Sequence, residues 1–123
     1  MRVLITGSRL WTDIETIRDT FNAYFAENPL TEPPTLVSGH CPRGADALAE
    51  QLFEEKGYPI ERYPADWSKG RSAGFDRNHQ MVVTYPDVCF AFILDRSRGA
   101  MHCSQLAELA QIRTIIVHRT SEP

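Results

Sequence analysis

The sequence lacks any apolar run long enough to cross a membrane. Its longest uninterrupted apolar stretch, Val88 to Leu94, reads V-C-F-A-F-I-L, whereas a membrane-spanning helix needs about 20 such residues. The start of the chain also lacks a secretory pattern, because Met1-Arg2 leads directly into a short apolar run and a Gly-Ser turn. A cytoplasmic protein with no membrane partner is therefore expected.

Cysteine pairs and metal-binding spacings are also missing. The three cysteines, Cys41, Cys89 and Cys103, are odd in number and show no C-x-x-C spacing, which argues against a disulfide framework and favours reduced thiols. Their spacing relative to the histidines matches no common zinc pattern. We expect no metal and no cofactor. Cys41 is either an inert loop thiol or a reactive one close to a helix start.

Positive charge is scarce, and lysine is the scarcest source of it. The chain has 13 Lys and Arg against 16 Asp and Glu, a formal net charge of −3. Sequence-independent binding of nucleic acid needs a basic face, so nucleic acid is not expected to be a partner. Of the basic residues, 2 are lysines and 11 are arginines. Arginine suits bidentate contacts with phosphate or carboxylate, so this composition favours an anionic ligand.

The common nucleotide-binding motifs are absent as well. Gly39 and Gly44 have the spacing of a P-loop, but Ala45-Asp46 stands where that motif needs Lys and Ser or Thr. The turn that begins at Gly7 reads G-S-R-L-W and has no second glycine, so it does not match G-x-G-x-x-G. Neither a Walker-type NTPase nor a standard dinucleotide-binding domain is expected.

What the sequence does contain is a regular alternation of apolar strands and amphipathic helices. Strands are expected at residues 2–6, 35–38, 59–63, 88–94 and 114–117, with four helices between them. The first helix is expected to begin at a capping box formed by Thr12 and Glu15. The pattern predicts one α/β domain spanning residues 1–123. It is a Rossmann-like, three-layer fold with a parallel five-stranded sheet in the order 3-2-1-4-5.

Three glycine-bearing loops follow the first, second and fourth strands, and each leads into a helix. In a parallel sheet these loops lie at one edge, where helix N-termini offer free N–H groups to an anion. Arginines accompany them: Arg9, Arg43, Arg96 and Arg98 in the loops, and Arg71 and Arg77 after the third strand. We therefore expect a phosphate-binding crevice at this edge.

Five sequence blocks run in order along nearly the whole chain. They are R-V-L-I-T-G-S-R-x-W (2–11), G-x-x-x-R-G-A-D-x-L-A (39–49), P-A-D-W (64–67), A-G-x-x-R-N-x-x-M (73–81) and S-R-G-x-x-H (97–102). Together they resemble the YspA-like, cpYpsA-related branch of the SLOG superfamily. That superfamily includes the LONELY GUY phosphoribohydrolases, often called lysine decarboxylase-like, and the DNA-processing protein DprA. The resemblance implies a Rossmann-like domain that senses or processes nucleotides in bacteria or their phages.

Carried over residue by residue, the resemblance implies a pocket for a phosphate-bearing nucleotide or nucleotide-like ligand. Its expected members are Gly7, Ser8, Arg9, Gly39, Arg43, Gly44, Asp46, Arg77, Asn78, Ser97, Arg98, Gly99 and His102. The last four close the phosphate end. Trp67 is added from its own chemistry, since it either stacks on a base or sugar or only covers the sheet edge.

The chain departs from the phosphoribohydrolases at their signature P-G-G-x-G-T-x-x-E. The corresponding stretch is R-S-R-G-A-M-H-C, so Cys103 stands where they carry glutamate. Ligand binding or sensing is therefore the first functional hypothesis. An N-glycoside hydrolase with Asp46 or His102 as acid or base is the second, and single-stranded nucleic-acid binding is the third. Related domains often pair, which makes a homodimer a further hypothesis.

Overall fold

Five strands form one sheet in the order β3-β2-β1-β4-β5 in the computed structural model, which describes residues 1–121. The strands are β1 (Arg2–Gly7), β2 (Thr35–Ser38), β3 (Ile60–Arg62), β4 (Val88–Leu94) and β5 (Arg113–Arg119). Every neighbouring pair is parallel, so each strand is joined to the next by a crossover. The predicted fold class and strand order are confirmed.

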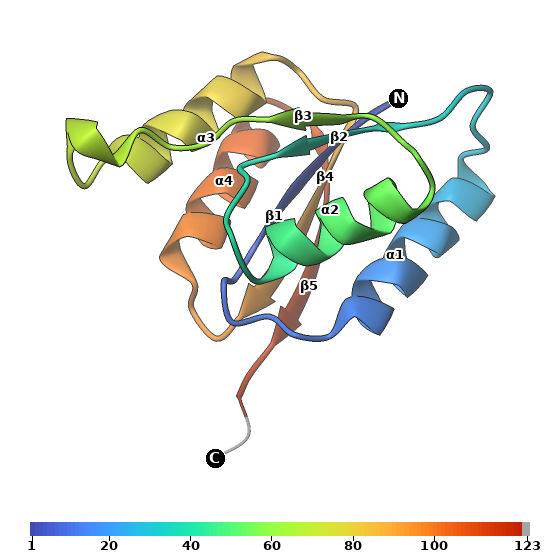
Figure 1. Cartoon of the computed structure of the whole chain (residues 1–123), viewed down its shortest axis with the longest axis horizontal. Helices are drawn as coiled ribbons and strands as arrows, with labels where there is room; N and C mark the ends of the chain where they lie inside the picture. The colour runs from blue at the N-terminus through green and yellow to red at the C-terminus, as the bar shows by residue number, and fades with distance from the viewer. Residues whose placement is uncertain (122–123) are drawn as a thin grey trace.

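Four α-helices cover the two faces of the sheet. They are α1 (Ile14–Glu27), α2 (Ala45–Glu55), α3 (Ala73–Val83) and α4 (Arg98–Leu109), and a short 3₁₀ helix, Trp67–Lys69, precedes α3. Figure 1 shows α1 and α2 on one side of the sheet and α3 and α4 on the other, which gives the predicted three layers. None of the helices in the described part of the chain is long and apolar enough to cross a membrane.

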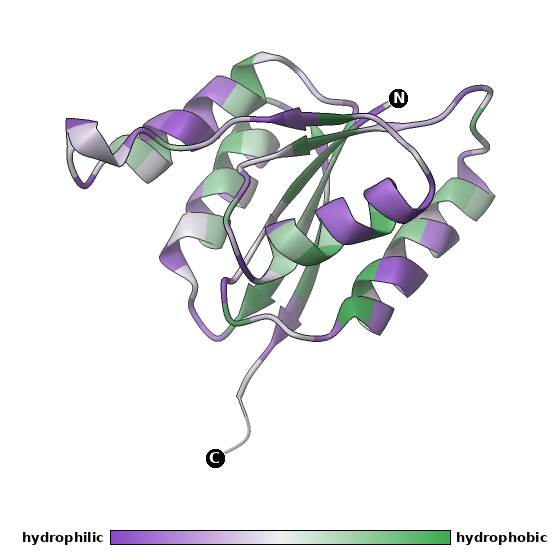
Figure 2. Cartoon of the chain, in the orientation of Figure 1, coloured by the Kyte–Doolittle hydropathy of each residue, from purple (hydrophilic) through white to green (hydrophobic). Residues whose placement is uncertain are grey.

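Alternate residues of the central strands point into two separate hydrophobic cores. Val3 and Ile5 pack with the residues of α1 and α2, whereas Leu4 packs with those of α3 and α4. Strand β4 is buried on both faces because it lies inside the sheet. In Figure 2 the central strands β1 and β4 are accordingly mostly hydrophobic, whereas part of β3, the end of β5 and much of the helices' surface are hydrophilic. Burial of this apolar surface is the main force that holds the layers together.

Helix α1 does not begin at the predicted capping box, so that detail was wrong. Its N-cap is Asp13, whose Oδ1 accepts a hydrogen bond from the backbone N–H of Thr16 at 3.1 Å. A carboxylate at the N-cap also interacts favourably with the helix dipole, which gives Asp13 the advantage over its neighbour Thr12. The hydrogen bonds from Thr16 lower the pKa of Asp13.

Strand β5 is one edge of the sheet, and an arginine stands at each of its ends. The guanidinium group of Arg113 lies 5.6 Å from the ring centroid of Tyr24. That of Arg119 lies 5.8 Å from the ring of Trp11 and 3.7 Å from Asp13 Oδ2. Both arginines therefore cover aromatic rings next to α1 with their charged ends, a contact that cation–π attraction favours.

Candidate functional site

A cavity of about 550 Å³ opens where the chain leaves the carboxyl ends of β1 and β4. The sheet reverses its winding direction between these two strands, which is where doubly wound sheets bind their ligands. Residues of the β1–α1 loop, the N-terminal half of α3 and the β4–α4 loop line the space. We call it the arginine cavity, after Arg9, Arg71, Arg77, Arg96 and Arg98 in its lining. Its volume suits a small molecule.

Ten of the fourteen residues predicted for the site line the arginine cavity. They are Gly7, Ser8, Arg9, Asp46, Trp67, Arg77, Asn78, Ser97, Arg98 and Gly99. They lie up to 92 positions apart in sequence, from 7 to 99, and the parallel sheet brings them together because the loops after β1, β2 and β4 share one edge. Their contact with a ligand stays a prediction.

Two predicted glycines contact the protein itself rather than the cavity. The carbonyl oxygen of Gly39 accepts a hydrogen bond from Arg77 Nη1 at 2.6 Å. Gly44 caps α2 with a φ of 83° and packs directly on the backbone of Ser8 and Arg9. A positive φ and this close approach both require glycine. These two glycines shape the walls of the cavity without lining it.

Two further predicted residues also lie outside the lining. Arg43 is exposed and is not among the residues that line the cavity. His102 packs against the ring of Phe75, with the two ring centroids 4.4 Å apart. Its Nδ1 lies 3.3 Å from Asn78 Nδ2. His102 therefore supports the wall from behind, and sequence alone could not separate this position from one that faces the cavity.

The charges in the cavity do not balance. The lining contains five arginines, of which Arg77 has its guanidinium bonded to Gly39 and Asn78, and two carboxyl groups, those of Asp46 and Asp95. No ion pair within 4 Å, among residues 1–121, involves any of the five arginines. Asp95 instead accepts a hydrogen bond from the backbone N–H of Ser121 at 2.8 Å. Over the same residues no group of three His, Cys, Asp or Glu side chains could hold a metal ion. The excess charge is therefore available to an anion.

The N-terminus of α4 adds backbone donors to this positive charge. Within the described residues its hydrogen-bond ladder begins at Met101, whose N–H donates to the carbonyl of Ser97 at 3.0 Å. The Ser97 side chain makes no capping bond, so the N–H groups of residues 98–100 have no partner inside the helix. A Cβ placed on Gly99 would meet nothing within 4 Å. The helix end is thus open to a ligand group.

Arg77 and Asn78 connect the loop after β2 to this helix end. Both side chains are buried, and Arg77 Nε donates to Asn78 Oδ1 at 3.0 Å. Asn78 Nδ2 in turn donates to the carbonyl of Gly99 at 3.2 Å. Together with the bond from Arg77 to Gly39, this chain fixes two walls of the cavity relative to one another. The two residues therefore act mainly by positioning the walls.

Two exposed aromatic side chains form another wall. Trp67 is 54% exposed and Phe75 is 45% exposed, and both line the cavity. The Trp67 ring packs on Gly74, where an added Cβ would lie 3.0 Å from the nearest ring carbon. The Arg9 Cζ lies over the same ring, 5.6 Å from its centroid. Sequence reasoning missed Phe75. The sequence feature that could have identified Phe75 is that it is apolar but lies outside the row of buried residues on α3, two positions before Arg77.

Asp46 and Cys41 share the floor of the cavity. Asp46 is 6% exposed, and its Oδ2 accepts a hydrogen bond from the backbone N–H of Cys41 at 3.3 Å. Burial raises the pKa of Asp46 because the charged form loses its hydration. Burial and the nearby Asp46 charge also raise the pKa of Cys41. A thiol held in its protonated form is a poor nucleophile, which favours the inert alternative for Cys41.

We expect Asp46→Asn to stabilise the protein at neutral pH in the absence of ligand. The pKa of Asp46 is raised on folding above its ordinary value of 3.8, so its contribution to stability is fullest below that value and is lost as the pH rises through the folded pKa. The difference in free energy of unfolding between Asp46→Asn and the wild type should therefore grow between acid and neutral pH. It should reach roughly 1 kcal/mol, as is common when a binding-site group is replaced. Urea denaturation at several pH values measures it.

Asp13→Ala is the matched control, because the pKa of Asp13 is lowered in the folded state. The contribution of the Asp13 carboxylate to stability is therefore present at neutral pH and is lost in acid. At pH 7 this variant should be destabilised by about 1 kcal/mol, as is usual for the loss of an N-cap. The defect should shrink as the pH falls. A pH-independent effect of Asp46→Asn would contradict the role given to burial.

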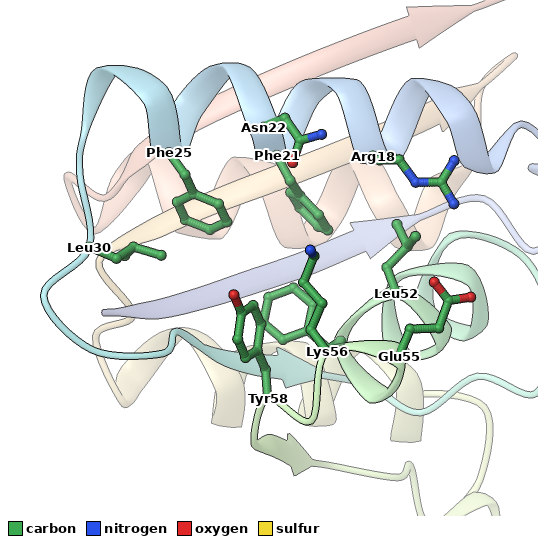
Figure 3. A pocket seen from close by; sticks show the side chains of 10 residues that line it. Arg18, Phe21, Asn22, Phe25, Leu30, Leu52, Glu55, Lys56 and Tyr58 are labelled. Atoms are coloured by element: carbon green, nitrogen blue, oxygen red, sulfur yellow. The ribbon is translucent and has the colours of Figure 1, made fainter.

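A second cavity, of about 460 Å³, lies between α1 and α2 (Figure 3). It is lined by Phe21, Phe25, Leu30 and Tyr58 and by the charged side chains of Arg18, Glu55 and Lys56. Its aromatic residues belong to the larger hydrophobic core or pack against it. This aromatic groove has one arginine in its lining where the arginine cavity has five and, among the described residues, no open helix N-terminus, so the arginine cavity is the better candidate for an anion site.

The chain belongs to the YspA, cpYpsA-related SLOG family, whose sequence profile, YAcAr, matches residues 1–70. It is also similar over most of its length to a phage protein. The Gene 61 protein of Mycobacterium phage D29 is 40% identical over 121 residues, which cover 93% of this chain and 94% of that protein. No solved structure matches the chain. The SLOG resemblance noted in the sequence is thereby confirmed.

Proposed function

We propose that the protein binds a phosphate-bearing nucleotide, or a ligand derived from one, in the arginine cavity. The observation that carries the proposal is the group of five arginines around one open space with no ion-pair partner among residues 1–121. Holding like charges together costs free energy, so such a group is typical of a site completed by an anion. Membership of a SLOG family supports a small-molecule ligand of this kind.

The lining suggests how a nucleotide would lie. The open N-terminus of α4, with Arg98 beside it and Gly99 leaving room, suits a phosphate group. The wall of Trp67 and Phe75 suits a flat base, because both rings are about half exposed and would be covered by stacking. The proposal therefore places phosphate near α4 and the base against α3.

Binding is favoured over glycoside hydrolysis by the position of Cys103. This residue stands where the phosphoribohydrolases carry glutamate, yet it is fully buried in the core formed with α3 and α4. Burial raises its pKa to about 12, so it supplies neither a carboxylate nor a thiolate to the cavity. The hydrolase alternative would depend on Asp46, and release of free base from AMP or NAD during the binding assays tests it.

The proposal is tested by adding AMP, ADP, ADP-ribose and NAD at millimolar concentration and following the melting temperature. A ligand at 100 times its Kd stabilises the native state by about 2.7 kcal/mol, which raises the melting temperature of a domain of this size by several degrees. Arg98→Ala should weaken the affinity about tenfold or more through the loss of a charge-assisted hydrogen bond. No shift with any of the four compounds would count against the proposal.

Arg43→Ala is the matched control for Arg98→Ala. Both arginines are exposed and lie within two residues of a helix start, but Arg43 lies outside the arginine cavity. Its removal changes the net charge by the same amount and should leave the affinity unchanged. Equal losses in the two variants would show that the ligand responds only to overall charge.

A further inference from the structure

Among the described residues, the Asp46 carboxyl group receives hydrogen bonds from Cys41 alone, through its backbone N–H and its thiol. Its Oδ2 receives the backbone hydrogen bond from Cys41. Every fully buried side-chain oxygen or nitrogen in residues 1–121 has a hydrogen-bond partner. Asp46 lines the arginine cavity while its side chain is more than nine-tenths buried. The other oxygen, Oδ1, accepts from no N–H or O–H group of residues 1–121, so it is not fully buried and is accessible from the cavity that Asp46 lines.

This oxygen needs a partner different from the phosphate that the arginines favour. A phosphate oxygen and a carboxylate oxygen are both acceptors and carry like charge, so they repel each other. A hydroxyl group is both a donor and an acceptor, and it can bond Oδ1 whether the carboxyl group is ionised or protonated. A neutral hydroxyl is thus the ligand group that fits this corner of the cavity best.

The proposed arrangement of the nucleotide puts its sugar near Asp46. Asp46 belongs to α2 and lines the arginine cavity together with Arg77 of α3 and Gly99 of α4. The phosphate end proposed above is at α4, and the base is against the aromatic wall. In a nucleotide the ribose joins these two parts.

We infer that Asp46 receives hydrogen bonds from the ribose hydroxyl groups and makes the arginine cavity selective for ribonucleotides over deoxyribonucleotides. This inference rests on the proposed function and adds the specificity of the same site. A site that hydrogen-bonds a hydroxyl group rejects an analogue that lacks it, because the buried acceptor is then left unpaired.

The test measures the Kd of AMP, GMP, CMP and UMP and of their 2′-deoxy and 3′-deoxy counterparts by calorimetric titration. At least one ribonucleotide should bind about tenfold or more tightly than one of its deoxy forms, as expected for a hydrogen bond to a charged group. In Asp46→Ala this ratio should fall close to one, mainly through weaker binding of the ribonucleotide. In Asp19→Ala, which removes an exposed carboxylate of α1, the ratio should stay as in the wild type.

The outcomes separate the two proposals. Binding of ribo and deoxy forms with equal affinity overturns the role of Asp46 and leaves the nucleotide site standing. Failure of every nucleotide to bind overturns both. A preference that persists in Asp46→Ala assigns the selectivity to another residue. A loss of discrimination between AMP and inosine monophosphate in Asp46→Ala, with the ribose preference intact, shows that Asp46 contacts a base amino group instead.

Discussion

Replacing Gly44 by alanine is expected to lower the free energy of unfolding by about 3 kcal/mol or more, a value reached only by severe substitutions. Gly44 has a φ of 83°, and a Cβ there would overlap with the carbonyl oxygen of Ser8 and the backbone of Arg9. These are backbone atoms, so a rotamer change cannot relieve the overlap. The loss would take a large share of a total stability of roughly 5–15 kcal/mol. Urea denaturation measures it.

Gly99→Ala is the matched control, because it adds the same methyl group at another helix start. A Cβ on Gly99 would meet nothing within 4 Å, and alanine has the higher helix propensity. The stability of this variant should therefore stay within about 0.5 kcal/mol of the wild type. Its nucleotide affinity should fall, because the methyl group would occupy the space left for the phosphate. Equal destabilisation by the two substitutions would contradict the separate roles given to these glycines.

Arg77→Ala is expected to cost about 3 kcal/mol of stability and to abolish ligand binding at the same time. Removing the buried guanidinium leaves the carbonyl of Gly39 and the Oδ1 of Asn78 without their donor, and each unpaired buried group costs about 1–3 kcal/mol. The loop after β2 would also lose its connection to α4. Chemical denaturation and the nucleotide titrations above measure the two effects.

Arg71→Ala provides the comparison for this variant. Arg71 also lines the arginine cavity, but it is exposed. Its removal should change stability by less than about 0.5 kcal/mol and reduce affinity only in part. Arg77→Lys should keep the charge yet recover little stability, because an ammonium group cannot reproduce the geometry of the guanidinium fork. An Arg77→Ala variant as stable as Arg71→Ala would show that the buried hydrogen bonds contribute little.

The sequence predicted the fold because its strongest signals come from burial. An apolar run such as Val88–Leu94 is unambiguous, since only a strand inside a parallel sheet is buried on both faces. The sheet-edge rule then indicated which loops would meet. The start of α1 was less secure, because Thr12 and Asp13 are both good N-caps and only the folded backbone decides between them.

The roles of the individual site residues could not be predicted, because identical residue types do different things there. Gly44 is needed by a close backbone approach, whereas Gly99 leaves open space. Arg98 lines the cavity and Arg43 does not, although both were predicted in glycine-bearing loops. Phe75 went unnoticed since an apolar residue at the start of a helix usually joins the core. These distinctions depend on tertiary packing, which no local pattern encodes.

The two arginines that end β5 have a consequence for self-association. If two copies extended their sheets by antiparallel pairing of β5 along its full length, with Ile116 at the twofold axis, Arg113 of each would face Arg119 of the other. Like charges directly opposite each other across a pair of strands oppose pairing, and charged side chains on an outer strand are a usual protection against aggregation. The two arginines thus disfavour antiparallel pairing between the β5 strands of two copies. A dimer of this protein is therefore expected to use a surface other than β5.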